Sequence, residues 1–304
     1  MKKTILFILI GCSSSLAWAQ SKGDELTTKG DMVGAMYAYG AEFMSNPTDT
    51  DKAYQLVTTL SLVNEVDTAF YFLNIALSND HSLKALVDSK LFNMSNHPKW
   101  AAIEQQQIKK YQEQRGAFDN PELTMRLLRV IMRDQALDFH IHKSRDYYQQ
   151  NGHAPHWVYP IGAMKNELNK GNYEEMHRIV KQYGWPTYDM VGDLAADALL
   201  LVVNHHPDAE VRKQYLPQIQ SACEAKQGSC TEYAKIHDRI LVDEGKEQLY
   251  GMQFRYGKGN KLEPFPVAYP ELVDQRRKAI GLEPLAEYLK RRIDYDWTVE
   301  QKED

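Results

Sequence analysis

The amino-acid sequence predicts a mainly α-helical protein, with N-terminal repeat-like helical hairpins and a C-terminal α-helical domain that contains a small β-hairpin. Apolar residues recur at helical spacing along much of the chain, which is typical of helices with one buried face. The stretch from Tyr250 to Tyr256 instead alternates apolar and polar residues, as a strand does, and a turn at 257–260 follows it. With 304 residues, of which 43% are hydrophobic and 25% are charged, the chain is long enough for two globular domains.

Residues 1–19 are predicted to form a secretory signal peptide. Two lysines after the initiator methionine supply a positive start, and residues 4–10 form a short apolar run. The sequence Ala17-Trp18-Ala19 then provides small residues for cleavage before Gln20. We therefore expect a mature protein that begins near Gln20 and is secreted across the inner membrane into the periplasm.

An alternative route of processing starts from Cys12, because the sequence Leu9-Ile10-Gly11-Cys12 resembles a lipobox, the motif that directs lipid attachment to its cysteine. The protein would then be a lipoprotein anchored through Cys12. The apolar run before Cys12 is only about seven residues long, at the lower edge of the usual range. No later segment approaches the ~18 uninterrupted apolar residues of a membrane span, so no transmembrane segment is expected.

The charge of the chain argues against a nucleic-acid partner. The formal net charge is -5, and loss of Lys2 and Lys3 with the leader changes it to -7 (-5 minus 2). Binding to nucleic acid depends on neutralising phosphates with basic residues, which this balance does not favour.

No cofactor or metal is expected from the sequence. A polar, aromatic tract, predicted to be a loop, contains His140, His142, His153 and His156. No carboxylate or thiol at a zinc-binding spacing completes a metal site there. The sequence also contains no complete phosphate-binding loop.

Residues 20–115 are predicted to form an N-terminal helical domain. Two neighbouring helical stretches carry apolar residues on one side, and small residues at Ala69 and Ala76 allow the helices to approach. The pair resembles one tetratricopeptide-like unit, and the alternative is an unrelated helical hairpin. Helix pairs of the tetratricopeptide type bind peptides or proteins, so a protein or peptide partner is expected at these helices. The apolar residues are Ala53, Leu56, Val57 and Leu60, then Phe70, Leu73, Ala76 and Leu77.

A second domain is predicted to span residues 118–293, followed by a polar tail at 294–304. The polar, glutamine-rich stretch 104–114 precedes the boundary, and Asn120-Pro121 provides an N-cap and a first helical residue. The core face of this helix carries Leu123, Leu127, Val130 and Ile131, and its polar side carries Arg126, Arg129, Arg133 and Asp134.

Cys223 and Cys230 are predicted to form a disulfide. They flank a short turn between two predicted helices, so their α-carbons can approach closely enough, and an oxidising compartment allows the bond. The alternatives are two unpaired structural thiols or a catalytic thiol. The last is the least favoured, because no basic or histidine neighbour is evident in the sequence.

His205 is the first candidate for catalysis. It ends the most apolar helix of the chain, which begins at Gly192-Asp193 and is expected to be the buried centre of the second domain. A histidine in that place can act as an acid or a base. The alternative is a histidine bound to a backbone carbonyl, or one that lies near the negative end of its helix.

Unusual polar residues follow near the end of the chain, on a helix, the predicted strand and another helix. Such residues either line a site or form a buried network, because every donor among core residues needs a partner. Asp238 is the second candidate catalytic residue. The candidate ligand-binding residues are Arg239, Gln248, Tyr250, Gln253, Arg276 and Arg277.

The C-terminal part of the chain resembles a bacterial domain family of unknown function, from about Pro121 to Leu289. Members typically carry threonine where this chain has Met252, and commonly glutamine at the position of Asn204. The resemblance implies the place of a site but no activity. The motifs that carry it are Gly184-Trp185-Pro186, Val191-Gly192, His205, Asp238-Arg239-Ile240-Leu241, Gly245-Lys246, Gln248, Tyr250-Gly251, Gln253, Arg276-Arg277 and Gly281-Leu282.

Two functions remain open from the sequence. The favoured one is a secreted, extracytoplasmic interaction module that binds a protein or peptide through its N-terminal helices. The alternative is an enzyme or small-ligand binder, hydrolase-like and with an anionic substrate. That alternative predicts that His205, Arg239, Gln253 and Arg276 converge on one open cavity.

Overall fold

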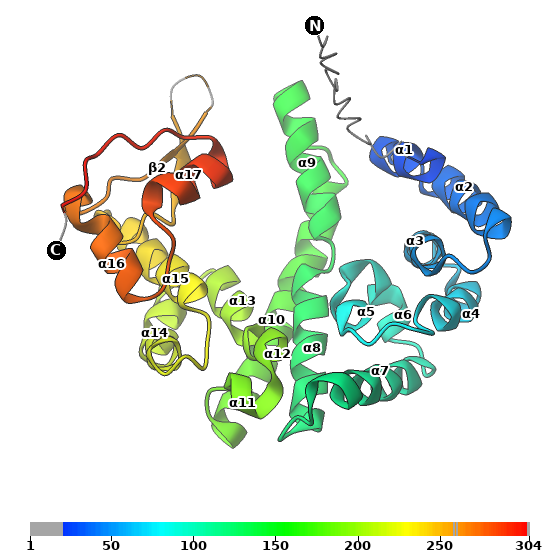
Figure 1. The fold of residues 1–304 in the computed structure, drawn as a ribbon. Coiled ribbons are helices and arrows are strands. Elements are labelled where there is room, and N and C mark those ends of the chain that lie inside the picture. Colours follow the sequence, from blue (N-terminus) through cyan, green and yellow to red (C-terminus); the bar gives the residue numbers. More distant parts are fainter. Residues whose placement is uncertain (1–20, 258, 260, 303–304) are drawn as a thin grey trace, which may run out of the picture. The chain divides into compact units, whose positions relative to one another are not determined.

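The computed structural model describes residues 21–257, 259 and 261–302. The predicted signal peptide and Cys12 lie outside these residues. The chain divides into two compact units, residues 1–78 and 79–304 (Figure 1). Helices dominate both units, and the second also contains a small antiparallel sheet, which confirms the predicted fold class.

The first unit consists of successive helices, each packed against the next. The faces predicted from apolar spacing are buried, because Ala53 and Leu56 of the third helix and Phe70 and Leu73 of the fourth are at most 4% exposed. The hairpins are therefore present, and their tetratricopeptide-like character stays a prediction. The helices are α1 (Lys22–Lys29), α2 (Met32–Ser45), α3 (Thr50–Leu62) and α4 (Val66–Ala76).

The second unit begins at residue 79 and includes the glutamine-rich helix α7 (Trp100–Arg115), and the domain boundary expected near residue 116 stays a prediction. The nearly buried Glu104 of α7 accepts from Nε of Arg129 at 2.6 Å. Gln107 is fully buried and donates to the carbonyls of Asp80 and Ser82. Three short elements precede α7, namely α5 (Lys84–Val87), η1 (Ser89–Leu91) and α6 (Phe92–Ser95).

Helix α8 (Pro121–Gln135) lies at the centre of the second unit. The side chain of Asn120 accepts from the backbone N–H of Leu123 at 3.0 Å, which confirms the predicted cap. The apolar helix α13 (Ala198–His205) packs against both α8 and α10 (Val158–Tyr183). Two short helices, α11 (Tyr188–Val191) and α12 (Asp193–Ala196), connect α10 to α13 (Figure 1).

Part of the histidine tract is helical rather than a loop. Residues Asp138–Asn151 form α9, which packs against α10. His140 and His142 thus lie on a helix, whereas His153 and His156 lie in the connection to α10. Among the residues that the structure describes, no group of three or more histidine, cysteine or acidic side chains is placed to hold a metal ion.

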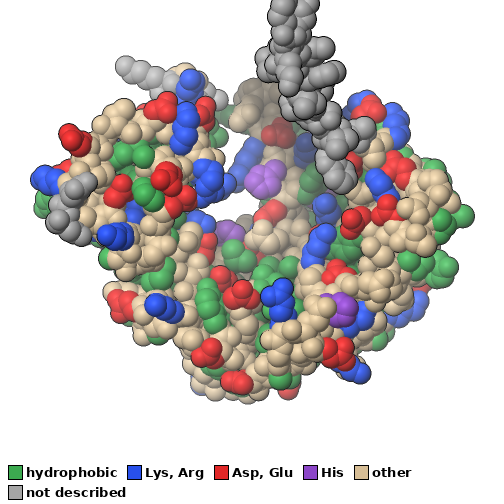
Figure 2. Space-filling model, in the orientation of Figure 1, with side chains coloured by type: hydrophobic (Ala, Val, Ile, Leu, Met, Phe, Trp, Pro, Cys, Tyr) green, Lys and Arg blue, Asp and Glu red, His purple; other side chains and the backbone are tan. Residues whose placement is uncertain are grey.

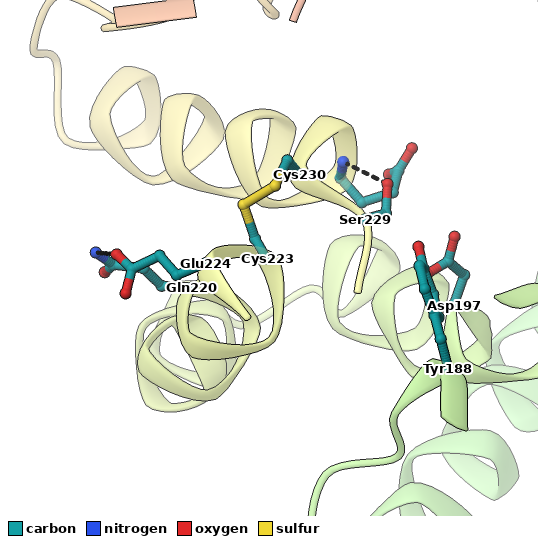
Figure 3. The surroundings of a disulfide bond; sticks show 8 residues. Tyr188, Asp197, Gln220, Cys223, Glu224, Ser229 and Cys230 are labelled. Atoms are coloured by element: carbon teal, nitrogen blue, oxygen red, sulfur yellow. Dashed lines mark hydrogen bonds between the residues drawn. A yellow bond between two sulfur atoms is a disulfide. The ribbon is translucent and has the colours of Figure 1, made fainter. Parts of the chain in front are cut away.

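Helices α14 (Ala209–Glu224) and α15 (Cys230–Asp243) form a hairpin that a disulfide closes. Cys223 and Cys230 are bonded, with their α-carbons 4.8 Å apart, which confirms the predicted pairing (Figure 3). The bond joins the last turn of α14 to the first residue of α15, so it fixes the turn between them.

Asp197 gives the fold a predicted dependence on pH. Burial raises the pKa of Asp197 from 3.8 to about 6, although the hydroxyl of Tyr188 donates to it and opposes this rise (Figure 3). Because the pKa of Asp197 is higher in the folded state than in the unfolded state, the protonated carboxyl stabilises the fold below pH ~4. This contribution is lost as pH rises through ~6. The difference in unfolding free energy between Asp197→Asn and the wild type should therefore change by about 2 kcal/mol in favour of the variant as pH rises from 4 to 7.

Urea unfolding of both proteins at each pH measures this gain, and Asp146→Asn, at an exposed carboxylate on α9, provides the control. The pH-dependent difference should appear in the first comparison and not in the second. An equal pH response of wild type and Asp197→Asn would contradict the prediction.

A compact C-terminal segment follows α15. Strands β1 (Phe254–Tyr256) and β2 (Leu262–Pro264) pair antiparallel, with Phe254 opposite Pro264, so the predicted hairpin is confirmed but is shorter than expected. After η3 (Pro270–Leu272) come α16 (Val273–Ala279) and α17 (Leu285–Ile293). The predicted tail packs back on this segment: Lys302 N–H donates to the carbonyl of Glu271, and Trp297 lies against the local core.

No helix among the described residues has both the length and the apolar character needed to cross a membrane. On the face drawn in Figure 2, acidic and basic side chains are interspersed. This mixture accords with the modest net charge of the sequence.

Candidate functional site

A cavity of about 430 Å³ opens between α8, α10 and α13. Small-molecule sites in proteins typically have volumes of roughly 300 to 1,000 Å³, so this cavity is large enough for a ligand. Its wall combines amide, imidazole and carboxylate groups with a few apolar side chains. The lining residues are Asp134, Asn166, Asn169, Lys170, Asn172, Tyr173, Val202, His205, His206 and Pro207.

A carboxylate and an imidazole pair in the wall of this cavity. Nδ1 of His205 lies 2.9 and 3.1 Å from the two carboxylate oxygens of Asp134. Asp134 is 1% exposed, whereas the side chain of His205 is 37% exposed. When Nδ1–H donates a hydrogen bond to the carboxylate, the neutral imidazole carries its free lone pair on Nε2. In this tautomer, His205 at the cavity wall can act as a base through Nε2.

Hydrogen bonds fix the end of α8, which carries Asp134. Gln135 Nε2 donates to the Asp134 carboxylate at 2.7 Å. The ammonium group of Lys165, from α10, donates to the backbone carbonyls of Asp134 and Ala136 and pairs with Asp138 at 2.8 Å. The last turn of α8 is thus bound to α10, and the carboxylate is held in place.

Two arginines fix the end of α13, which carries His205. Arg239 of α15 donates to the carbonyl of Asn204 at 2.6 Å, and Arg212 of α14 donates to the carbonyl of His206 at 2.5 Å. Cationic donors at the C-terminal carbonyls of a helix satisfy groups that have no partner within the helix and complement its dipole. Arg239, a predicted ligand-binding residue, therefore binds the carbonyl of the residue before His205 and helps to position the imidazole.

Helix α10 contributes amides at helical spacing. Asn166, Asn169 and Asn172 are three residues apart, which places them on one side of the helix. Asn172 is fully buried and donates to the carbonyl of Val130 at 3.3 Å. The amide oxygens of Asn169 and Asn172 are buried and have no hydrogen-bond partner among the described residues. A buried acceptor without a donor costs about 1–3 kcal/mol, which a bound donor would offset.

The other predicted site residues form a separate group around the loop 248–253. Asp238 of α15 is fully buried, and its carboxylate accepts from the backbone N–H groups of Leu249, Tyr250 and Met252 at 2.8 to 3.1 Å. Burial raises the pKa of Asp238 to about 6, and the three N–H donors oppose that rise. These N–H groups donate to a carboxylate and not to a neighbouring strand, so the predicted strand begins only at Phe254.

Gln248 and Gln253 close the same loop. The buried side chain of Gln248 donates to the carbonyls of Gln253 and Phe265 and accepts from the N–H of Gln253 at 2.8 Å. Gln253 in turn donates to the carbonyl of Lys235 at 2.9 Å. Gly251 allows the loop its shape, because its φ is +77° and an added Cβ would lie 2.4 Å from Leu285.

The arginine pair binds the carbonyls of the loop. Arg276 donates to the carbonyls of Leu249 and Ala268 at 3.0 and 2.6 Å. Arg277 is 1% exposed and donates to the carbonyls of Tyr250 and Glu283. The ring of Tyr250 contacts the rings of Tyr233 and His237. The loop therefore has its N–H groups bound by Asp238 and its carbonyls bound by arginines.

The structure does not bring the predicted residues to one cavity. His205 lines the cavity, Arg239 binds the helix end beside it, and Gln253 and Arg276 bind backbone groups of the other cluster. Asp134 was expected on the polar side of α8 and is instead the buried partner of His205. The asparagines of α10 were not singled out from the sequence, although their three-residue spacing is a pattern that could have indicated this cavity.

Comparison with known proteins locates the cavity within a family. No curated protein and no solved structure matches the chain. A family of unknown function, DUF6624, matches residues 121–299, more than half of the chain. The match starts at the first residue of α8 and extends beyond α17, so it includes both the cavity and the loop cluster. The chain belongs to the DUF6624 family, whose function is unknown.

Proposed function

We propose that the C-terminal domain binds a small polar molecule in the cavity between α8, α10 and α13, and that His205 exchanges a proton with it. One observation carries this proposal: the pair of Asp134 and His205, with a buried carboxylate and a half-exposed imidazole in the cavity wall. A carboxylate that accepts from Nδ1 holds the imidazole in one orientation and stabilises the imidazolium formed when Nε2 takes a proton.

The lining residues favour hydrolysis by an activated water molecule, since they include no serine, threonine or cysteine that could act as the nucleophile. Nε2 of His205 would take a proton from water as its oxygen bonds to the electrophilic carbon or phosphorus. The imidazolium would then return the proton to the leaving group. Lys170 at the cavity wall is placed to meet an anionic group, and the amides of α10 would bind neutral donors and acceptors.

The test uses the mature chain and a panel of small esters, amides and phosphomonoesters, with turnover and binding followed by NMR. His205→Gln should reduce turnover at least ~100-fold, as expected for loss of a general base. Asp134→Asn should reduce kcat more than it raises KM, because Asp134 positions the imidazole. His177→Gln, on α10 and outside the cavity lining, is the matched control. Turnover by His205→Gln at the wild-type rate, or no binding of any panel member, would contradict the proposal.

A second function, binding of a protein or peptide by the N-terminal unit, is favoured by exposed apolar residues on α2. Val33, Tyr37 and Met44 are 53%, 71% and 71% exposed, and their spacing of four and seven residues places them on one helix face. The disulfide supports the proposed secretion to the periplasm, where such bonds persist. Equal recovery of periplasmic partners by the wild type and by Tyr37→Glu/Met44→Glu would contradict this function.

A further inference from the structure

A second cavity, of about 370 Å³, lies where α7 begins beside α8. Trp100 and Ala101 from the first turn of α7 line it, together with Asn96, Arg129 and Arg133. None of these residues lines the cavity of His205, so the two cavities are different places within the same unit.

Arg133 is an unpaired cation in this second cavity. Among the described residues its guanidinium makes no hydrogen bond or ion pair, and its Nε atom is buried without a partner. Burial lowers the pKa of Arg133, the effect expected of a charge that has lost water. The charge of Glu175 opposes this shift but forms no ion pair with Arg133. A half-buried charge without a directly bound counter-ion destabilises a protein, and an anion beside it would offset that penalty.

The neighbouring arginines on α8 do have partners. Arg129 pairs with Glu104, and Arg126 pairs with Glu175, whose other oxygen binds Arg178 of α10. Four arginines therefore meet two carboxylates, which leaves a local excess of two positive charges (4 minus 2) in a chain whose formal net charge is -5. One of these two charges is on Arg133, because the other three guanidinium groups are in ion pairs with the two carboxylates.

The start of α7 adds a second feature that favours an anion. Helix α7 is 16 residues long, has no side-chain cap hydrogen bond at its first turn, and has no acidic residue there. The first N–H groups of a helix have no partner within it, and the helix dipole makes this end positive. The N–H of Trp100 already donates to the carbonyl of His97 at 2.9 Å, so the N–H of Ala101 is the first that an anion could use. Anions bind at such ends, and the first two residues of α7 line the cavity beside Arg133.

We propose that this cavity is a binding site for a small oxyanion, a phosphate or carboxylate group. The guanidinium of Arg133 would bind two oxygens of the anion through its parallel N–H groups, and the N–H of Ala101 at the start of α7 would bind another oxygen. Asn96 supplies a further amide at the wall. The site uses no residue of the Asp134 and His205 pair, so it does not depend on the function proposed for that pair.

The experiment follows the ¹⁵Nε signals of arginine and the backbone amide signals of Trp100 and Ala101 while inorganic phosphate, and separately malonate, is added at constant ionic strength. We expect saturable shifts at Arg133 and at the start of α7. The tighter of the two probes identifies whether phosphate or carboxylate is preferred. Shifts that do not saturate, or that are spread over exposed arginines, would overturn the proposal.

Variants separate a specific site from general attraction. Arg133→Gln should weaken binding at least tenfold, whereas Arg178→Gln, which removes an exposed arginine of the same cluster, should leave it within twofold. Phosphate should raise the Tm of the wild type and not that of Arg133→Gln. Because Arg133 has no partner to lose, Arg133→Gln should fold with an unchanged or higher Tm in phosphate-free buffer, so its failure to bind can be interpreted.

His205→Gln distinguishes this proposal from the proposed acid–base function. It should bind phosphate at the start of α7 with wild-type affinity even if it has lost turnover. Equal affinities of the wild type and Arg133→Gln would overturn the oxyanion site and leave the function of His205 unaffected. Loss of phosphate binding in His205→Gln would overturn the independence of the two cavities.

Discussion

Replacement of Asp238 with asparagine is expected to lower the free energy of unfolding by about 3 kcal/mol at pH 7.5. The two carboxylate oxygens accept from three backbone N–H groups, those of Leu249, Tyr250 and Met252. An asparagine side chain has one oxygen, so its NH₂ group would face an N–H donor in a fully buried place. The substitution therefore removes charge-assisted bonds and leaves a buried donor without an acceptor.

Urea unfolding monitored by circular dichroism measures this loss. Asp296→Asn is the matched control, because the side chain of Asp296 is 79% exposed and pairs only with the exposed Lys290 among the described residues. Its effect should stay within about 0.5 kcal/mol. A loss below 1 kcal/mol in Asp238→Asn would show that the loop finds other acceptors for its N–H groups.

Local patterns in the sequence predicted much of the fold. The cap at Asn120, the disulfide between Cys223 and Cys230 and the hairpin after Phe254 are confirmed, since each depends on residues close together in the chain. The packing of α7 within the second compact unit was not evident from the sequence, because a polar helix can be fixed by ion pairs that its own spacing does not show. Glu104 of α7 meets an arginine that lies 25 residues later.

Polar residues of the candidate site were harder to place, because their partners come from distant segments. Asp134 and His205 are 71 residues apart, and nothing local to either predicts the other. Asp238 and Arg239 are neighbours in the chain, yet one binds the loop that starts at Leu249 and the other binds the end of α13. On a helix, consecutive side chains point in directions about 100° apart, so adjacent polar residues need not serve one site.

Arg277→Lys is expected to lower the free energy of unfolding by about 3 kcal/mol although the charge is kept. Arg277 is 1% exposed, and its guanidinium donates to the carbonyls of Glu283 and Tyr250 and lies 4.9 Å from the centre of the Tyr288 ring. A lysine ammonium is a compact, strongly hydrated charge that cannot span both carbonyls. Arg292→Lys, at an exposed position of α17, is the control.

The double variant Asp238→Asn/Arg277→Lys tests whether the two residues act on one loop. The N–H of Tyr250 donates to Asp238, and the carbonyl of Tyr250 accepts from Arg277. If the two residues hold one loop, either substitution alone should also weaken the hydrogen bonds between the loop and the residue that was not replaced. The loss in the double variant should then be smaller than the sum of the single losses by at least about 1 kcal/mol. Strictly additive losses would mean that each residue stabilises its own surroundings, and that the loop is not the structural unit that joins α15 to α16.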